Sequence, residues 1–179
     1  DIVNFTVDGV GLATVADSLA AIEQRVVNEK RLSWDELKHV LDTNYENAED
    51  IRLMLKNIDR YGSGGSLGDK WAKKVSELFT GLVKGSPLPE THFNIIPGLF
   101  SHGIVGPLGK MLPATPNGRF AGTEISHNAE PDPGFCRDGR AAPTAKAAAV
   151  AMTQPGYGNS APLQIELDTN LAKNAGGVD

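Results

Sequence analysis

The sequence predicts an α/β fold with outer helices in the first half of the chain and long loops plus short strands in the second half. Residues 1–84 carry apolar side chains at a spacing of three and four, with recognisable helix starts and stops between the runs. Residues 85–179 contain proline-rich and glycine-rich connections around short apolar runs and one alanine-rich segment. Polar faces on the first-half helices are typical of the outer layer of an α/β protein.

The first two elements are a short strand and a long helix. Residues 2–7 alternate apolar and polar side chains, which predicts a strand, and residues 8–11 form the turn after it. Thr14 is the candidate N-cap of the helix that follows, and Asp17 lies toward the flank of its apolar face. That face is formed by Leu12, Val15, Ala16, Leu19, Ile22 and Val26.

Three more helices are predicted before residue 85. Ser33 and Glu36 form a capping-box pattern, which starts a helix over residues 34–42. A helix over residues 47–60 follows, and a glycine-rich stretch ends it. The next helix spans residues 67–84.

The glycine-rich stretch, residues 62–70, resembles a phosphate-binding loop only superficially. A P-loop needs Gly-Lys-Ser/Thr directly at the helix start, whereas Asp69 intervenes and Trp71 follows in this chain. The Asp69 carboxylate stands where an anion would bind. We therefore interpret the stretch as a flexible linker between two helices.

The second half contains short strands and a long loop. Residues 92–97 predict a strand, whose length Pro97 limits. Residues 98–139 are predicted to be mostly loop, longer than the roughly 15 residues beyond which structureless connections are uncommon in compact domains, which is typical of functional segments or segments packed by other parts of the protein. An alanine-rich helix over residues 143–152 and a strand over residues 162–168 complete the prediction.

Composition and charge exclude several classes of protein. With 179 residues, 40% of them hydrophobic, the chain is long enough to form a core of its own. The net charge of −5 and a pI of about 5.4 argue against nucleic-acid binding, for which a pI above about 9 is expected. No apolar run approaches the roughly 20 residues of a membrane span, and no signal-peptide pattern opens the chain, so the cytoplasm is the predicted location. Asp1 in place of methionine indicates a processed chain or a piece of a longer one.

Residues 113–122, named here the arginine loop, have few accessible backbone conformations. Two prolines and the pair Asn117-Gly118 fix the turn, which presents Arg119 at a defined place. In one interpretation Arg119 ties down neighbouring loop carbonyls or a carboxylate, and in the other it binds an anion or a substrate. The first is favoured, since no second phosphate-binding group stands nearby in the sequence.

Cysteine and histidine offer weak candidates for chemistry. The single cysteine, Cys136, excludes an internal disulfide, and the adjacent Arg137 could lower its thiol pKa. Without a base or metal partner defined by the sequence, a thiol hydrolase built on Cys136 and His127 is a remote alternative. His102 and His127 flank the arginine loop and could meet in space. No metal site is predicted, since no two histidines stand three or four residues apart among His39, His92, His102 and His127.

Three stretches resemble segments of the glycyl radical enzymes, the superfamily of pyruvate formate-lyase and related lyases. Residues 114–122, ATPNGRFAG, resemble the family's ATPDGR-x-AG stretch. Residues 11–22, GLATVADSLAAI, resemble its GLxxVADSLAAI helix, and residues 128–134, NAEPDPG, resemble its loop that contains Ala-Asn-Pro. The stretches stand in the family's order, and the resemblance covers about residues 3–168.

The resemblance implies that residues 1–179 are a partial pyruvate formate-lyase-like barrel domain. This domain is mostly helical over residues 1–84 and contains loops, short strands and one alanine-rich helix over residues 85–179. Family members fold as a ten-stranded α/β barrel, in which a backbone glycyl radical generates a thiyl radical that abstracts hydrogen from a small organic substrate. The implied function is that of a fragment of a glycyl radical lyase, dehydratase or acyltransferase of anaerobic metabolism.

The resemblance also implies that both radical residues lie outside this chain. The family's radical cysteine precedes the GLxxVADSLAAI helix, so Cys136 is in the wrong place. Residues 119–122 and the pair Gly156-Tyr157 imitate the glycine motif Arg-Val-x-Gly-Tyr but lack its full context. The chain should then be inert alone and bind no cofactor. The alternative is a non-catalytic scaffold or binding module derived from the same fold.

Partners and pocket residues follow from the same resemblance. The implied partners are the rest of the parent polypeptide, a radical S-adenosylmethionine activating enzyme, a small-molecule substrate and a second copy of the chain in a homodimer. No catalytic residue is expected in this chain. Candidate pocket-lining residues are Asp8 at the end of the first strand, Asn159 before the last strand, and Gln164 and Glu166 on it. In the alternative interpretation the opposite face of the last strand points inward, with Leu163, Ile165 and Leu167.

Overall fold

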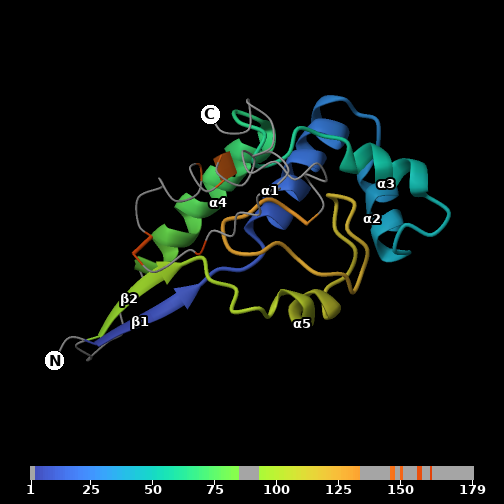
Figure 1. Ribbon diagram of the computed structural model, residues 1–179. Coiled ribbons are helices and arrows are strands. Elements are labelled where there is room, and N and C mark those ends of the chain that lie inside the picture. The colour runs from blue at the N-terminus through green and yellow to red at the C-terminus, as the bar shows by residue number, and fades with distance from the viewer. Residues whose placement is uncertain are drawn as a thin grey trace, which may run out of the picture.

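A computed structural model describes residues 3–84, 93–133, 146, 147, 150, 157, 158 and 162. A two-stranded parallel sheet projects from a body of packed helices (Figure 1). Strand β1 is Val3–Asp8 and strand β2 is Phe93–Gly98, with Val3 opposite Phe93 and Asp8 opposite Gly98. Both predicted strands are confirmed, and each ends one residue later than expected. Parallel neighbours need a long crossover connection, and the first-half helices supply it.

Helix α1 (Leu12–Ala21) continues directly into the π-helix η1 (Ile22–Asn28). The prediction of Thr14 as N-cap is wrong, because Gly11, at φ 85°, precedes the helix and Thr14 lies inside its first turn. The Thr14 backbone N–H donates to Ser126 Oγ over 3.1 Å. A hydroxyl from a distant segment therefore satisfies a donor that a local cap normally satisfies.

Helix α2 (Trp34–Asp42) has the predicted bounds. Both hydrogen bonds of the capping box between Ser33 and Glu36 are present. These two bonds are local in sequence, which explains why the start of the helix could be predicted to the residue.

Helix α3 (Glu49–Lys56) is shorter than the predicted residues 47–60. Asn47 before it has φ 55°, and Asn57 after it leaves helical backbone at ψ 73°. The chain then turns inward, and Arg60 and Tyr61 become buried. Tertiary contacts of these two residues, described below, end the helix earlier than its apolar spacing predicts.

Helix α4 (Leu67–Lys84) has the predicted bounds, and Asp69 organises the glycine-rich stretch before it. The Asp69 carboxylate accepts backbone hydrogen bonds from Gly62 over 2.8 Å, Gly64 over 2.8 Å and Ser66 over 2.9 Å. The carboxylate thus fills the place of a bound anion, as expected. The expectation of a flexible linker is corrected to a turn that these hydrogen bonds hold in place.

Helix α5 (Val105–Lys110) lies within residues 98–139, which were predicted to be mostly loop, and it was not predicted from the sequence. Pro107 stands in the first turn, where a missing N–H costs the helix no hydrogen bond. Two glycines and a proline in six residues obscured the helix in the sequence. A Cβ on Gly109 would lie 2.1 Å from the Thr123 carbonyl oxygen, so α5 packs directly against the chain after the arginine loop.

Two buried apolar clusters hold the helices together. The first packs α1 against α4 and the segments after β2, with small side chains that let the two helices approach closely. The second packs η1, α2 and α3 against the arginine loop. Val15, expected on the apolar face of α1, is 45% exposed. The first cluster contains Leu12, Ala13, Ala16, Tyr61, Ala72, Leu99, Ala129 and Ala147, and the second contains Ala21, Val26, Leu32, Leu37, Val40, Tyr45, Ala48, Leu55 and Ala114.

Most of the predicted C-terminal elements lie outside the described residues. In the alanine-rich segment, Lys146, Ala147 and Val150 have helical backbone. The predicted strand of residues 162–168 falls outside the description except for Pro162, which has no regular structure. Within the described ranges, no helix is long and apolar enough to span a membrane.

Candidate functional site

A buried ion network joins α1, the turn after α3 and the segment that follows the arginine loop. Arg60 Nη1 lies 3.6 Å from Asp17 Oδ2 and 3.3 Å from Asp132 Oδ2. The side chains of Arg60, Asp17 and Asp132 are 6%, 0% and 10% exposed. One guanidinium therefore compensates two carboxylates that water hardly reaches, as buried charges require.

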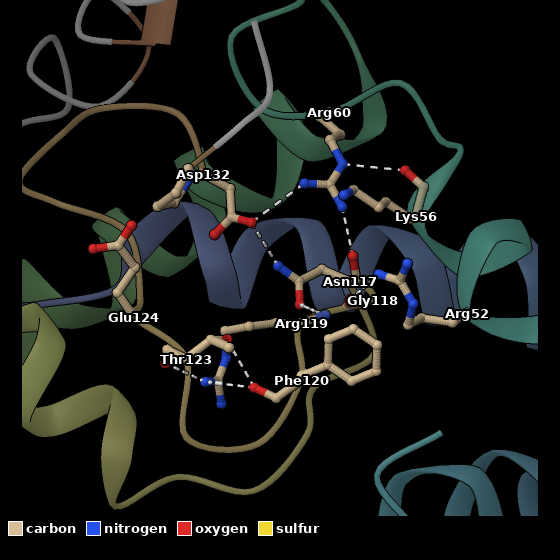
Figure 2. Close-up of a pocket in the computed structure, with 11 residues that line it drawn as sticks. Arg52, Lys56, Arg60, Asn117, Gly118, Arg119, Phe120, Thr123, Glu124 and Asp132 are labelled. Carbon is tan, nitrogen blue, oxygen red and sulfur yellow. Dashed lines mark hydrogen bonds and ion pairs between the residues drawn. The ribbon is translucent and has the colours of Figure 1, made fainter. Parts of the chain in front are cut away.

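Asp132 connects this network to the arginine loop and to the start of α1. Its Oδ2 accepts a hydrogen bond from Asn117 Nδ2 over 3.1 Å, and its Oδ1 accepts one from the Thr14 hydroxyl over 2.7 Å. Arg60 Nη2 donates to the Asn117 carbonyl over 2.5 Å. Figure 2 shows Asp132 between Arg60 and Asn117. The three stretches that carry the sequence resemblance thus meet at one buried carboxylate.

Arg119 is directed into its own loop. Its Nη1 donates to the carbonyls of Phe120 over 3.1 Å and Thr123 over 2.6 Å, and its Nε donates to Thr115 Oγ1 over 3.2 Å. Its Nη2 donates to the Pro113 carbonyl. Burial lowers the pKa of the Arg119 guanidinium below its ordinary value. Four of the five N–H donors of the guanidinium are thus used by loop oxygens, a geometry that suits holding the loop.

Gly118 sits where a side chain would be strained and crowded. Its φ is 84°, and a Cβ there would lie 3.0 Å from Lys56 Cβ and 3.1 Å from the Arg52 carbonyl. Arg52 Nη1 donates to the Gly118 carbonyl over 3.1 Å, and the Arg52 guanidinium lies 4.5 Å from the centre of the Phe120 ring. The Asn117-Gly118 turn is therefore fitted against α3.

A cavity of about 300 Å³ lies between α3 and the arginine loop. Its walls carry several cations, but the guanidinium groups of Arg52, Arg60 and Arg119 are directed at protein oxygens. The cavity is therefore polar without offering an unused guanidinium fork to an anion. Its lining, drawn in Figure 2, consists of Arg52, Lys56, Arg60, Asn117, Gly118, Arg119, Phe120, Thr123, Glu124, Asp132 and Pro133.

The buried network shifts the pKa of the Asp17 carboxyl. Burial raises the pKa of the Asp17 carboxyl from 3.8 to about 7, against the opposing effects of Arg60 and of the Tyr61 N–H. That N–H donates to Asp17 Oδ1 over 2.8 Å, while Oδ2 has no hydrogen-bond partner among the described residues. The expectation that Asp17 lies toward the flank of α1 is therefore wrong.

Asp17 should make the protein less stable as pH rises from about 4 to about 7. Between the unfolded pKa of 3.8 and the folded pKa of about 7, the folded protein holds a proton that the unfolded chain has lost, so the free energy of unfolding falls through this window. The total is at most on the order of 4 kcal/mol, because one pKa unit is about 1.4 kcal/mol. Asp17→Asn should flatten this part of a urea-unfolding profile, whereas Asp35→Asn, at an exposed site, should not. An unchanged slope in Asp17→Asn would contradict the assignment.

The predicted pocket-lining residues are mostly outside the described part of the chain. Asn159, Gln164 and Glu166 are not described, and neither is Cys136. Asp8 is the last residue of β1, and its Oδ2 lies 3.7 Å from His102 Nε2. Of the four predicted pocket residues, the structure therefore describes Asp8, which lies at the carboxyl end of β1.

His102 and His127, the two histidines that flank the arginine loop, both lie near Ser101. His127 Nδ1 lies 3.2 Å from the hydroxyl of Ser101, whose neighbour is His102. No direct contact between the two imidazoles is found among the described residues. In the described part of the chain, no group of three or more acidic, histidine or cysteine side chains is placed to hold a metal ion.

Sequence reasoning missed the roles of Arg60 and Asp132. One signal could have indicated them: Asp17 stands among alanines on a helix whose neighbouring positions are buried. A carboxylate at such a position needs a buried cation as partner. The sequence does not say which of the 17 lysine and arginine residues supplies it.

Comparison with known proteins gives consistent matches. A model of the family described as pyruvate formate lyase-like matches residues 2–107. Isethionate sulfite-lyase of Oleidesulfovibrio alaskensis is 35% identical over 117 residues, which cover 65% of this chain and 14% of that protein. Trans-4-hydroxy-L-proline dehydratase of Clostridioides difficile is 28% identical over 132 residues, which cover 72% of this chain and 16% of that protein. The chain thus spans a small part of the length of these relatives.

Solved structures agree with the sequence matches. The glycerol-bound B12-independent glycerol dehydratase from Clostridium butyricum superposes with a TM-score of 0.77 at 27% identity, over 84% of this chain and 20% of that chain. A glycyl radical enzyme from Archaeoglobus fulgidus superposes with a TM-score of 0.79 at 23% identity, over 98% of this chain and 22% of that chain. Because the identity to the Archaeoglobus fulgidus enzyme is only 23%, that match shows similarity of fold alone.

Proposed function

Because the chain belongs to the pyruvate formate lyase-like family of glycyl radical enzymes, we propose that it is the late part of the barrel domain of a glycyl radical lyase or dehydratase. The observation that carries this proposal is the meeting of three family-like stretches at Asp132. Residues that resemble the family in sequence are the ones that fix the helices and the arginine loop in space. A chain that keeps these contacts keeps the scaffold on which the family's chemistry depends.

The proposed substrate is a small hydroxylated molecule. Relatives of this chain are named for isethionate and trans-4-hydroxy-L-proline, and structural neighbours for glycerol and 1,2-propanediol. Each of these compounds carries at least one hydroxyl group. The proposed reaction class is elimination of a small leaving group, water or sulfite, from such a molecule.

Among the described residues, the Arg119-Phe120-Ala121-Gly122 sequence does not fit a glycyl radical site. Gly122, at the end of the Arg119-Phe120-Ala121-Gly122 sequence, is exposed to solvent, whereas a carbon radical needs shielding from water and oxygen. Arg119 in that sequence is engaged by loop oxygens. We therefore place the glycyl radical and its cysteine in other parts of the parent polypeptide, so that the isolated chain binds no cofactor and is inert.

The rest of the proposal concerns partners and location. A radical S-adenosylmethionine enzyme would install the glycyl radical, the parent polypeptide would form a homodimer, and the whole would act in the cytoplasm. Asp8, Asn159, Gln164 and Glu166 remain the proposed pocket-lining residues. The late barrel strands would exclude water from the reaction, while the helices α1 to α4 hold those strands from outside.

The test uses the natural polypeptide that contains this chain. After anaerobic activation with a radical S-adenosylmethionine activating enzyme, we expect a glycyl radical signal in the EPR spectrum and turnover of at least one of isethionate, glycerol, 1,2-propanediol or trans-4-hydroxy-L-proline. The 179-residue chain alone should give neither. A natural polypeptide that forms no radical under the same conditions would leave the scaffold or binding module as the better account.

A further inference from the structure

A second polar group of side chains lies beside the carboxyl end of β2, where Ser101 meets two residues from the segment after the arginine loop. Ser101, three residues after β2, is 2% exposed, and Asn128 is 8% exposed. His127, next to Asn128, is half-buried. These three residues, named here the strand-end cluster, lie outside the network of Arg60. Ligands of open α/β sheets bind at the carboxyl ends of the strands, which makes the chemistry of this cluster relevant.

The hydrogen bonds of the strand-end cluster favour one arrangement of its protons. The backbone N–H of Ser101 donates to the Asn128 side chain over 3.0 Å, so the atom that faces it must be the amide oxygen Oδ1. Ser101 Oγ lies 3.2 Å from the same oxygen. An amide oxygen cannot donate a hydrogen bond. The single hydroxyl proton of Ser101 is therefore directed at Asn128.

This arrangement favours one tautomer of His127. Its Nδ1 lies 3.2 Å from Ser101 Oγ, the same distance that separates this hydroxyl from Asn128 Oδ1. When the hydroxyl proton is directed at Asn128, Nδ1 of the neutral ring carries the hydrogen and donates it to the hydroxyl oxygen, and Nε2 is unprotonated. Among the described residues, no hydrogen bond to His127 Nε2 is found. In this tautomer the ring presents Nε2 as a hydrogen-bond acceptor.

Two residues at or beside the cluster have left-handed backbone, which asparagine and histidine adopt more often than most other non-glycine residues. Asn128 has φ 37° and His102 has φ 47°, both in the left-handed region. The His102 ring also lies 3.8 Å, centre to centre, from the Phe100 ring, and its Nε2 lies 3.7 Å from Asp8 Oδ2. Conformations of this kind persist where the surroundings determine them strongly, and they concentrate at binding sites.

We propose that the strand-end cluster is a ligand-binding site in which His127 Nε2 accepts a hydrogen bond from the hydroxyl group of a small molecule. Ser101 and Asn128 are positioning residues, because they set the tautomer that makes Nε2 an acceptor. The ligand class rests on the proposed function, which supplies small hydroxylated substrates. The tautomer itself rests on the hydrogen bonds alone, so the two parts can fail separately.

The first experiment measures the tautomer by ¹⁵N NMR of the natural polypeptide labelled at histidine, at a pH where the imidazoles are neutral. The His127 signals are those that His127→Gln lacks. We expect Nδ1 to show the shift of a protonated nitrogen and Nε2 that of a bare one, while His39, exposed on α2, gives averaged shifts. In Ser101→Ala the His127 shifts should move to the averaged values. A protonated Nε2 in the unmodified protein would overturn the proposal without any variant.

The second experiment adds glycerol or isethionate to the same sample, without radical activation. We expect a saturable shift of the His127 Nε2 signal with at least one probe, no shift at His39, and loss of the response in Ser101→Ala. If neither probe moves the His127 signal, or if His39 moves equally, the binding site is refuted. Since no turnover is needed, this outcome is independent of whether the activated polypeptide forms a glycyl radical.

Discussion

Replacing Arg60 with methionine is expected to destabilise the protein by about 3–5 kcal/mol, the range found when one partner of a buried ion pair is removed. Arg60 Nη1 is the cation shared by Asp17 and Asp132, and both carboxylates are almost completely buried. Methionine keeps much of the side-chain volume but supplies no charge and no donor. The two carboxylates, and the Asn117 carbonyl that accepts from Arg60, are then left without their partner.

Denaturant unfolding checks this result, with Arg31→Met as the matched control. The Arg31 side chain is 57% exposed and lies 4.0 Å from Glu29, so its loss should change stability by no more than about 0.5 kcal/mol. Asp17→Asn in the Arg60→Met background should recover part of the loss, since one uncompensated buried carboxylate disappears. Equal effects of Arg60→Met and Arg31→Met would mean that the buried network contributes nothing to stability.

The elements that the sequence predicted well are those with local causes. Helices α2 and α4 have the expected bounds because a capping box starts the first and Ser66 with Asp69 starts the second. Strand β1 follows from a short alternating run and β2 from a short apolar segment, and their parallel pairing agrees with the α/β class. The family itself was identified correctly from three short stretches.

The errors have long-range causes. Thr14 is not a cap, because Gly11 turns the chain and Ser126 supplies the acceptor from another segment. Helix α3 ends early because Arg60 is drawn to Asp132, and α5 forms because Gly109 can pack against the Thr123 carbonyl. Periodicity within one element carries no information on such contacts. For the same reason the strand-end cluster, which joins Ser101 to Asn128, could not be read from residue spacing.

Gly68→Ala is expected to cost about 3 kcal/mol or more, whereas Gly81→Ala on the same helix should stabilise the protein by about 0.5–1 kcal/mol. A Cβ on Gly68 would lie 2.3 Å from the Tyr61 backbone nitrogen and 2.8 Å from Asp17 Oδ1. Those atoms form the hydrogen bond that holds the buried carboxylate, so they cannot separate cheaply. A Cβ on Gly81 meets nothing within 4 Å.

Both glycines lie in α4, Gly68 in its first turn and Gly81 in its last, and a Cβ meets close neighbours only at Gly68, so the difference between the variants reports mainly the contact at Gly68. Thermal and denaturant unfolding of the two variants measure that difference. If Gly68→Ala were also stabilising, α4 could shift away from α1 without loss, and the Asp17 to Tyr61 hydrogen bond would have no part in fixing the helix pair. A loss of stability in Gly68→Ala alone would show that the packing of α1 on α4 depends on the contact with Asp17, the same buried carboxylate that Arg60 compensates.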